Sequence, residues 1–553
     1  MQKEKMHEAN SLDFDKLSKL WISILRSVPI RSVIGGFFLG ILRVLASAVW
    51  PIFLYQSLKQ IGNSSGADIL INLAAVIFML LFAAASHHFQ SKVNINILGK
   101  FTVELSSQIW KKMNALDWLT FHGKNRVYYF DMLLIETWRV RNGLVSLLES
   151  IFVNALIAMI LSVFIGFINL PLFFVCLAGL VITASAHILA TVQTRPFMKQ
   201  FHDAWRVQHH WIAKCVDQFD LLKMDRAYAE SFDAHHKNTN EFIGVNSRLL
   251  RTQAKWQNIN QFVANMVRIT VFMIGIYWVK VEFIGLDALL LTLLIVSIVQ
   301  GNISQITGGM GNIMEAQESL KTISLFLNLK EEKIADTNSF IEFPAIAKIS
   351  IRDLSYGYNN TFVVKNVNLD LHAGNIYLWR GANGSGKTTV AHILMGLIEP
   401  EHGILKINDQ PADWGALKSL RRRFAYLNQD SLIFMGDIKE NALFGHPEPQ
   451  LAWESLQTSW LYRLLPGAHL EGARRVGERG EGLSGGESKR IAFIRELLRS
   501  SEILILDEPL NHLDENVVQE IEREIVNIKA ETIVIIISHQ LGFERLADEI
   551  REF

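Results

Sequence analysis

The sequence predicts a multi-pass α-helical membrane domain followed by an α/β domain, and three observations lead to this prediction. The chain has 553 residues, a length that suggests more than one domain. Half of its residues are hydrophobic and only 20% are charged, which excludes a disordered chain. The apolar residues are concentrated before about residue 325, whereas short strand-like and helical runs alternate from Ile349 onward.

Charge and cysteine content exclude several classes of protein. The 54 Lys and Arg residues balance 54 Asp and Glu residues, so the formal net charge is zero. A nucleic-acid-binding protein would need a basic surface, and we therefore expect no nucleic-acid partner. Two cysteines, Cys176 and Cys215, cannot form a disulfide framework, and neither lies in a spacing typical of a metal site.

Six apolar runs are long enough to cross a hydrocarbon core, which takes roughly 20 residues. Together they define a predicted membrane domain at residues 1–325. The predicted spans cover residues of about 33–54, 69–85, 151–168, 172–190, 262–279 and 283–303.

The connections between these spans alternate in length and charge. The long segments Gln90–Ser146 and Thr191–Lys255 hold eight and ten Lys and Arg residues respectively, whereas the short loops hold almost none. Because positive residues mark the cytoplasmic side, we expect the long segments and both termini to be cytoplasmic. The predicted location is the cytoplasmic (inner) membrane.

A polar linker at residues 326–346 precedes the predicted α/β domain at residues 347–553. Buried strands are expected at Ile376–Trp379, Ile503–Leu506 and Ile533–Ile537, because these runs are short, apolar and rich in β-branched residues. Such strands alternating with helical runs are typical of a mostly parallel sheet.

A glycine-rich loop follows the first of these strands and precedes a predicted helix. It fits the G-x-x-x-x-G-K-[ST] pattern, in which backbone N–H groups surround phosphate oxygens. Lys387 would contact the outer phosphates, and the Thr388 hydroxyl would bind Mg²⁺. The sequence therefore predicts a P-loop nucleotide-binding domain. The loop comprises Gly381, Ala382, Asn383, Gly384, Ser385, Gly386, Lys387, Thr388 and Thr389.

Two carboxylates end the strand at residues 503–506. Asp507 suits the Mg²⁺ shell and Glu508 could polarise the attacking water. The alternative is that the pair only caps the following helix. With the phosphate loop upstream, we expect the catalytic role.

Together with several further motifs, these residues make the whole chain resemble the ATP-binding cassette (ABC) transporters. Gln429 matches the glutamine of the Q-loop in that family, which implies that it also contacts Mg²⁺. His539 matches the switch histidine of the family. Tyr358 matches the aromatic residue that stacks on adenine. Leu513-Asp514 matches the end of the D-loop, and Val476–Gly480 resembles the X-loop of exporters. The signature loop is matched by Leu483, Ser484, Gly485, Gly486 and Glu487, with Glu487 in place of the usual glutamine.

The resemblance implies an exporter-type half-transporter with ATPase activity, and ATP and Mg²⁺ as cofactors. In the family, the signature loop of one cassette closes over the ATP of the other, so this chain is expected to form a homodimer. A heterodimer with another half-transporter stays open. Short transverse coupling helices are expected near Trp118–Arg126 and Asp217–Asp225.

Polar residues in the fifth span suggest where a substrate would bind. Asn258, Gln261, Asn265 and Arg268 recur at helical spacing, and we expect one polar face toward a cavity, with helix packing as the alternative. The leading cargo is a small peptide or microcin-like antimicrobial. Alternatives are a lipid or lipid-linked glycan flippase, a multidrug exporter or, from another class, an ATP-gated channel or membrane sensor.

Overall fold

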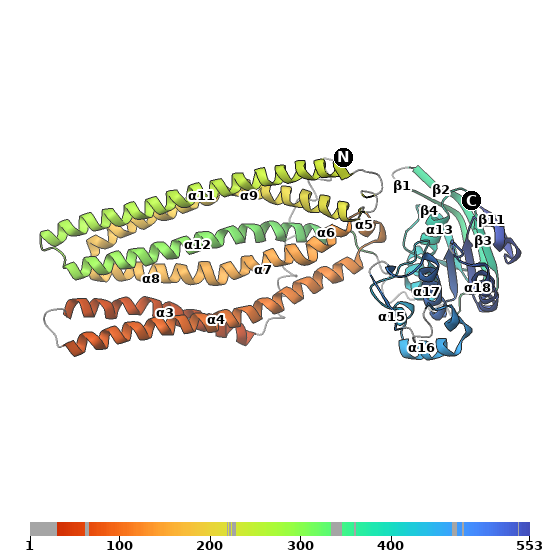
Figure 1. The fold of residues 1–553 in the computed structure, drawn as a ribbon, viewed down its shortest axis with the longest axis horizontal. Coiled ribbons are helices and arrows are strands. Elements are labelled where there is room, and N and C mark those ends of the chain that lie inside the picture. The colour runs from red at the N-terminus through yellow and green to blue at the C-terminus, as the bar shows by residue number, and fades with distance from the viewer. Residues whose placement is uncertain are drawn as a thin grey trace. The chain divides into compact units, whose positions relative to one another are not determined.

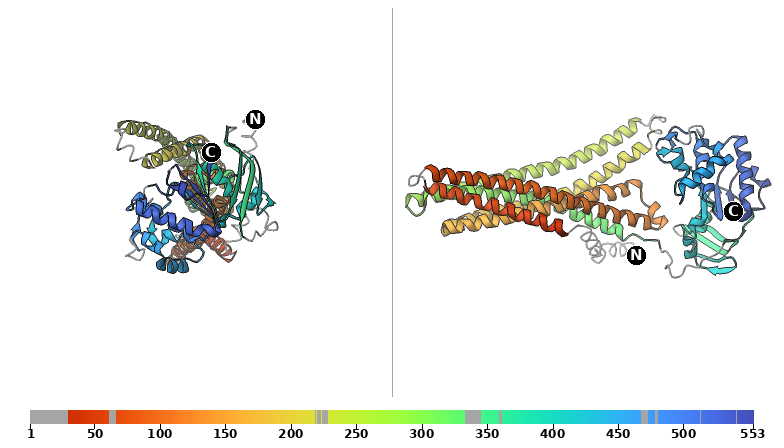
Figure 2. Two further views of the ribbon diagram at one scale, coloured as in Figure 1. Left: turned by 90° about the vertical axis from the view of Figure 1, so that its right-hand side faces the viewer. Right: turned by 90° about the horizontal axis from the view of Figure 1, so that it is seen from below.

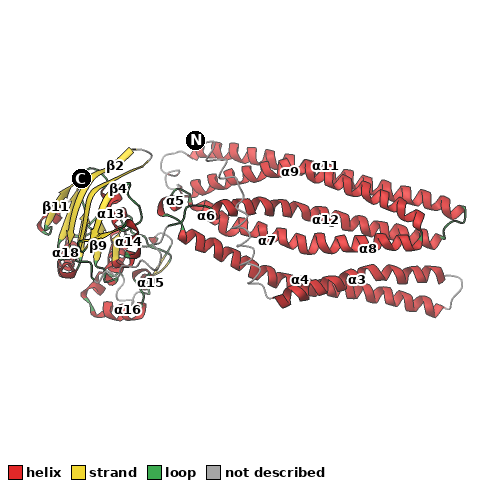
Figure 3. Cartoon of the chain, turned by 180° about the vertical axis from the view of Figure 1, so that it is seen from behind, coloured by secondary structure: helices red, strands yellow, loops and turns green. Residues whose placement is uncertain are grey.

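The computed structural model describes residues 30–60, 66–217, 219, 223, 228–332, 345–358, 361–466, 473–477, 480–511, 513–539 and 541–553. The chain divides into two compact units. The first, here the membrane unit, comprises Met1–Leu116 and His122–Lys330, and its described part consists of helices joined by short turns (Figure 3). The second, the nucleotide-binding unit, comprises Asp117–Phe121 and Glu331–Phe553 and contains the strands of both large sheets.

The membrane unit contains six described helical stretches that are long and apolar enough to cross a membrane, which confirms the predicted six-span architecture. In each of them, less than half of the most apolar window is buried within the chain, so apolar side chains remain for lipid or a partner. The elements are α3 (Ile30–Gln60), α4 (Gly66–Ala115), α6 (Arg126–Phe130), η1 (Asp131–Glu136), α7 (Thr137–Val145), η2 (Ser146–Phe152), α8 (Val153–Ile168), α9 (Leu170–Asp217), α11 (Tyr228–Lys280) and α12 (Leu286–Leu327).

These helices pack as pairs around α12 (Figures 1 and 2). Helix α3 lies along α4, and α9 lies along α11, while α12 contacts α7, α8, α9 and α11. Glycines allow the closest approaches, because a Cβ at Gly143, Gly179 or Gly275 would lie 2.1–2.4 Å from a side-chain atom of the facing helix. Helix α12 is accordingly the most buried of the six apolar windows, at 44%.

The nucleotide-binding unit is built on a five-stranded parallel sheet in the order β11-β3-β10-β9-β6. The predicted buried strands are its centre: β3, β10 and β9 are neighbours, and every residue of β9 and β10 is buried. Its strands are β3 (Ile376–Arg380), β6 (Phe424–Leu427), β9 (Ile503–Asp507), β10 (Ile533–Ile537) and β11 (Glu549–Glu552).

Side chains of these strands alternate between two apolar cores, as the period of two along a strand requires. Ile503 and Ile505 pack in one cluster, whereas Leu504 and Leu506 pack in the other. Helices on both faces cover the sheet (Figure 1). They include α13 (Lys387–Leu394), α14 (Trp414–Ser419), α15 (Ile438–Ala442), α16 (Pro449–Thr458), α17 (Gly485–Leu498) and α18 (Glu515–Ile528).

A second, antiparallel sheet has the order β2-β1-β4-β5, and the sequence analysis did not identify it. Its strands carry charged and amide residues on one face, which hides the apolar signal of a buried strand. The strands are β1 (Lys348–Tyr358), β2 (Thr361–His372), β4 (His402–Ile407) and β5 (Gln410–Ala412).

Candidate functional site

The glycine-rich loop connects β3 to α13 and adopts the backbone geometry that its glycines permit. Gly381, Gly384 and Gly386 have φ of 141°, 82° and 98°, values that L side chains rarely adopt. A Cβ at Gly386 would also lie 2.9 Å from Val364 Cγ2 and 3.0 Å from the Val363 carbonyl. The loop therefore needs these glycines for both its turns and its contact with β2.

Lys387 begins α13 and turns its amine back over the loop. Its Nζ donates hydrogen bonds to the carbonyls of Gly381 (2.8 Å) and Ala382 (2.9 Å), and its side chain is buried. Burial lowers the pKa of the Lys387 ammonium, although the carboxylates of Asp507 and Glu508 raise it in part. The positive charge is thus held where loop and carboxylates meet.

Asp507 ends β9 beside the start of α13. Its Oδ2 accepts hydrogen bonds from Thr388 Oγ1 at 3.3 Å and from Tyr426 Oη at 3.5 Å. Burial raises the pKa of Asp507, and the Thr388 hydrogen bond opposes this shift. Hydroxyl and carboxylate oxygens are the ligands that Mg²⁺ prefers, so the pair fits the predicted metal contact.

Glu508 follows with a left-handed backbone, φ 49°, and only 9% of it is exposed. Its N–H donates to the Ile537 carbonyl at 2.8 Å, which ties it to the end of β10. Its carboxylate accepts from the His539 backbone N–H at 3.1 Å and lies 3.9 Å from His539 Nε2. The predicted base and the predicted switch histidine are therefore direct neighbours.

These elements enclose one pocket of about 560 Å³. It brings together the phosphate loop, Gln429, both carboxylates and His539, which lie far apart in the sequence. The pocket is also lined by three residues that the sequence analysis did not predict: Val363, Asn511 and Ile537. Val363 lies there because β2 pairs with β1, and no local sequence motif indicates this pairing. The lining residues are Val363, Asn383, Gly384, Gly386, Lys387, Thr388, Thr389, Gln429, Asp507, Glu508, Asn511, Ile537 and His539.

Gly381, Ala382 and Ser385 of the loop do not line this pocket, and neither do two other predicted groups. Tyr358, the expected adenine contact, is 38% exposed and its ring lies 5.0 Å from that of Tyr356. The signature residues 483–487 are also absent from the described lining of the pocket. Their roles toward nucleotide stay predictions.

The signature residues form the start of α17. Ser484 Oγ accepts from the Glu487 N–H at 3.1 Å, and Glu487 Oε2 accepts from the Ser484 N–H at 2.8 Å, a reciprocal capping box. Arg474 pairs with Glu487 Oε1 at 2.9 Å. Burial raises the pKa of Glu487, but the hydrogen bonds from Ser484 and Arg474 outweigh it and the net shift is downward. The unusual glutamate therefore has a cap and a counter-ion.

One further cation links α17 to the Q-loop and escaped the sequence analysis. Lys489 is buried, and its Nζ donates to the Gln429 carbonyl at 3.2 Å. Burial lowers the pKa of Lys489, and Asp507, Glu508 and Asp430 raise it in part. A lysine two residues past the signature looks like a solvated helix residue in sequence, so no signal could have revealed this contact.

The first predicted coupling segment is the short helix α5 (Trp118–His122), which ends before Arg126. The Trp118 ring lies 4.7 Å from the His392 ring of α13, and His392 lies 6.1 Å from the Tyr426 ring. Tyr426 in turn donates to Asp507. Most of the second predicted segment, Asp217–Asp225, lies outside the described residues.

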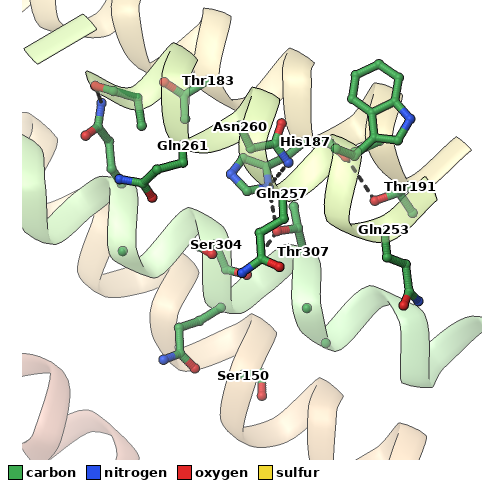
Figure 4. A pocket seen from close by; sticks show the side chains of 18 of the residues that line it. Ser150, Thr183, His187, Thr191, Gln253, Gln257, Asn260, Gln261, Ser304 and Thr307 are labelled. Atoms are coloured by element: carbon green, nitrogen blue, oxygen red, sulfur yellow. Dashed lines mark hydrogen bonds between the residues drawn. The ribbon is translucent and has the colours of Figure 1, made fainter. Parts of the chain in front are cut away.

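The membrane unit holds a larger polar cavity, of about 860 Å³ (Figure 4). Gln261 and Arg268 line it, whereas Asn258 and Asn265 are not among its lining residues, and the substrate role of the predicted face stays a prediction. The true face of α11 runs through Gln257, Gln261, Ala264 and Arg268, because 3.6 residues per turn displace positions 258 and 265 around the helix. Asn265 instead accepts hydrogen bonds from Gln261 and Arg268.

Comparisons with known proteins agree with this architecture. Residues 364–511 match the family model described as ABC transporter. A probable ABC transporter ATP-binding/permease protein of Haemophilus influenzae is 24% identical over 305 residues, 55% of each chain. A beta-(1-->2)glucan export ATP-binding/permease protein, NdvA, of Rhizobium meliloti is 24% identical over 67% of this chain and 64% of its own. The matched part of the chain therefore covers 55% and 64% of the length of these two curated relatives.

A solved structure shares the fold over nearly the full chain. The structure of a bacterial Atm1-family ABC exporter with ATP bound superposes with a TM-score of 0.82 and 17% identity, covering 95% of this chain and 94% of its own. Together with the phosphate loop, the paired carboxylates and the six spans, these findings show that the chain belongs to the ABC transporter family, as a half-transporter that carries a membrane domain and an ABC ATPase domain in one polypeptide.

Proposed function

We propose that the protein hydrolyses ATP to export a hydrophilic cargo across the cytoplasmic membrane, with both termini on the cytoplasmic side. The observation that carries this proposal is the convergence of the phosphate loop, Asp507, Glu508 and His539 on one pocket. A domain that only binds nucleotide needs no positioned carboxylate beside its phosphate site. A sensor or gated channel is therefore the weaker candidate.

The residues divide the chemistry between binding and turnover. Lys387 and the loop amides hold the phosphates, while Thr388 and Asp507 would hold Mg²⁺, which neutralises developing charge on the phosphate oxygens when bound. Glu508 orients and deprotonates the attacking water. His539, whose N–H already donates to Glu508 Oε1, keeps that carboxylate in place.

A second copy of the chain completes the site in this proposal. The signature loop presents a capped helix N-terminus, which favours anions, yet it lines no part of the described phosphate pocket of its own chain. One chain carries every motif, so a homodimer would have two complete hydrolytic sites without residues from a different protein. A heterodimer with a different half-transporter is the alternative.

Both the cavity and the relatives bear on the cargo. A small peptide or microcin-like antimicrobial is the class proposed from sequence, and the amide-rich cavity can hydrogen-bond to peptide groups. The glucan exporter among the relatives adds a saccharide as the second candidate. Drug-like and lipid-tail cargoes fit a polar cavity less well.

The test uses purified protein reconstituted into proteoliposomes, with the cassettes outside. Wild-type protein should consume ATP and accumulate cargo from separate peptide and oligosaccharide pools, while Glu508→Gln protein should do neither. ATP consumption without accumulation from any pool would contradict export and support the sensor reading. If activity appears only after a second half-transporter is added, the homodimer is wrong.

A further inference from the structure

The cavity of the membrane unit has an unusual lining for a site inside apolar helices. Among the described residues that line it, none has an aliphatic side chain larger than alanine and none is acidic; Trp256 is its aromatic residue and Arg268 its charged one. Amides and hydroxyls make up most of the rest, as Figure 4 shows. They are Ser150, Thr183, Thr191, Thr194, Gln253, Gln257, Asn260, Gln261, Ser297, Gln300, Ser304, Gln305, Thr307 and Asn312.

A histidine joins the helices that form one wall of this cavity. His187 Nδ1 of α9 lies 2.9 Å from Thr307 Oγ1 of α12 and 3.1 Å from Asn260 Nδ2 of α11 (Figure 4). All of these residues line the cavity. The contact between Asn260 Nδ2 and His187 sets the orientation of the Asn260 side-chain amide and therefore the position of its Oδ1 atom.

Two buried acceptors of the lining have no hydrogen-bond partner among the residues that the structure describes. Gln300 Nε2 donates to the Ala264 carbonyl at 3.1 Å, which sets the orientation of the amide and leaves Gln300 Oε1 as an unpaired acceptor. Asn260 Oδ1 is likewise unpaired. The two residues are only 6% and 8% exposed. Buried polar atoms are nearly always paired, so these oxygens indicate a bound group that donates hydrogen bonds.

The chemistry of the cargo follows from this lining. A polyhydroxylated molecule offers O–H donors to the two oxygens and acceptors to the surrounding amides and hydroxyls. The Trp256 ring can cover the C–H face of a sugar ring. Arg268 suits a neutral or anionic substituent and repels a cation. Apolar peptide side chains and lipophilic cations would find neither aliphatic contacts nor a carboxylate.

We propose, resting on the export function above, that the cavity binds a saccharide without net positive charge. The same chemistry could come from a free oligosaccharide or from the glycan of a glycolipid. In either case the sugar contacts Asn260, Gln300 and Trp256, and the recognition does not depend on nucleotide.

Binding is measured on full-length protein in nanodiscs without nucleotide, by isothermal titration. The probes are maltoheptaose, a glycolipid that carries maltoheptaose and is built into the nanodisc, a neutral heptapeptide, and tetraphenylphosphonium. Maltoheptaose or its glycolipid should bind more tightly than the heptapeptide or tetraphenylphosphonium. Binding of the free sugar indicates a soluble cargo, whereas binding of the glycolipid alone indicates a lipid-linked one.

The decisive variants remove single acceptors. Gln300→Leu and Asn260→Leu should weaken sugar binding about tenfold to a hundredfold, the effect of leaving a hydrogen-bonding group unpaired. Asn258→Leu is the matched control for Asn260→Leu, because both residues lie on α11 and Asn258 is exposed outside the lining of the cavity. Trp256→Phe should retain binding that Trp256→Ala loses. Unfolding temperatures show whether each variant is folded, and Gln300→Leu avoids the His187 contact.

Several results would overturn the proposal. Wild-type protein that binds neither sugar probe, or that binds the heptapeptide or tetraphenylphosphonium more tightly, would contradict it. So would equal effects of Asn258→Leu and Gln300→Leu. Sugar binding without ATP-driven transport would instead overturn the proposed export function and leave the saccharide site standing. Transport of peptide without sugar binding would overturn the saccharide site and leave the proposed export function standing.

Discussion

The phosphate pocket and the membrane cavity are built in opposite ways. The pocket joins short, contiguous motifs at the ends of neighbouring strands, and its ligand contacts include an ammonium and two carboxylates. The cavity takes single polar residues from α9, α11 and α12, and its contacts are mostly neutral amides and hydroxyls. Fixed charges would suit the proposed Mg²⁺-bound triphosphate, whereas neutral hydrogen-bonding groups would suit the proposed cargo.

The largest expected effect separates turnover from binding within the phosphate pocket. Glu508→Gln should lower ATP turnover by about 10²–10⁴, the usual effect of losing a positioned general base, and should leave nucleotide binding intact. Phosphate release and binding of a fluorescent ATP analogue measure the two. Glu520→Gln, an exposed carboxylate of α18, is the control. Near-normal hydrolysis by Glu508→Gln would reject the assignment.

Removal of the Lys387 ammonium should have the next largest effect, and this effect should be on nucleotide binding. Lys387→Ala removes the ammonium held by the Gly381 and Ala382 carbonyls, and hydrogen bonds to charged groups contribute about 1.5–3 kcal/mol. We expect nucleotide affinity to fall about tenfold to a hundredfold, measured by equilibrium binding. Unchanged affinity would mean that the backbone amides alone hold the phosphates.

The aromatic contacts of Trp118 offer a subtler test of the nucleotide-binding unit. If the stack through His392 and Tyr426 positions Asp507, then Trp118 and His392 should be energetically coupled. A double-mutant cycle on turnover with Trp118→Ala and His392→Ala should give about 0.5–1.5 kcal/mol, typical of aromatic pairs. Trp118→Phe should retain most of it. Strictly additive effects would show that the stack plays no part in positioning.

The smallest expected effect concerns the signature glutamate. Glu487→Ala removes the capping box and should cost about 1 kcal/mol of stability, whereas Glu487→Gln keeps an acceptor for Ser484. Because the folded pKa of Glu487 is lowered, its contribution is present above the pKa of an unfolded glutamate and is lost as pH falls through the folded value. Unfolding temperatures measured from neutral to acidic pH should therefore converge for wild type and Glu487→Gln. Parallel curves would show that the charge contributes nothing.

The contrast between the two sites also explains what sequence could predict. The six spans, the phosphate loop and the strands β3, β9 and β10 followed from hydropathy and from contiguous motifs. His187 gave no such signal, since it is one polar residue in an apolar helix. Asn258 and Asn265 were placed in the cavity because spacing alone cannot fix which part of a helix surface faces inward. Val363 needed tertiary packing to reach the pocket, and Lys489 needed it to reach the Gln429 carbonyl.

The central claim is that one site does the chemistry and a separate site recognises the cargo. It is tested most directly by titrating ATP and maltoheptaose, each alone, into wild-type, Glu508→Gln and Gln300→Leu protein in nanodiscs. We predict that Glu508→Gln binds both ligands as wild type does, while Gln300→Leu loses sugar affinity about tenfold or more and retains ATP affinity. Loss of both affinities in Gln300→Leu, or loss of sugar binding in Glu508→Gln, would contradict the claim.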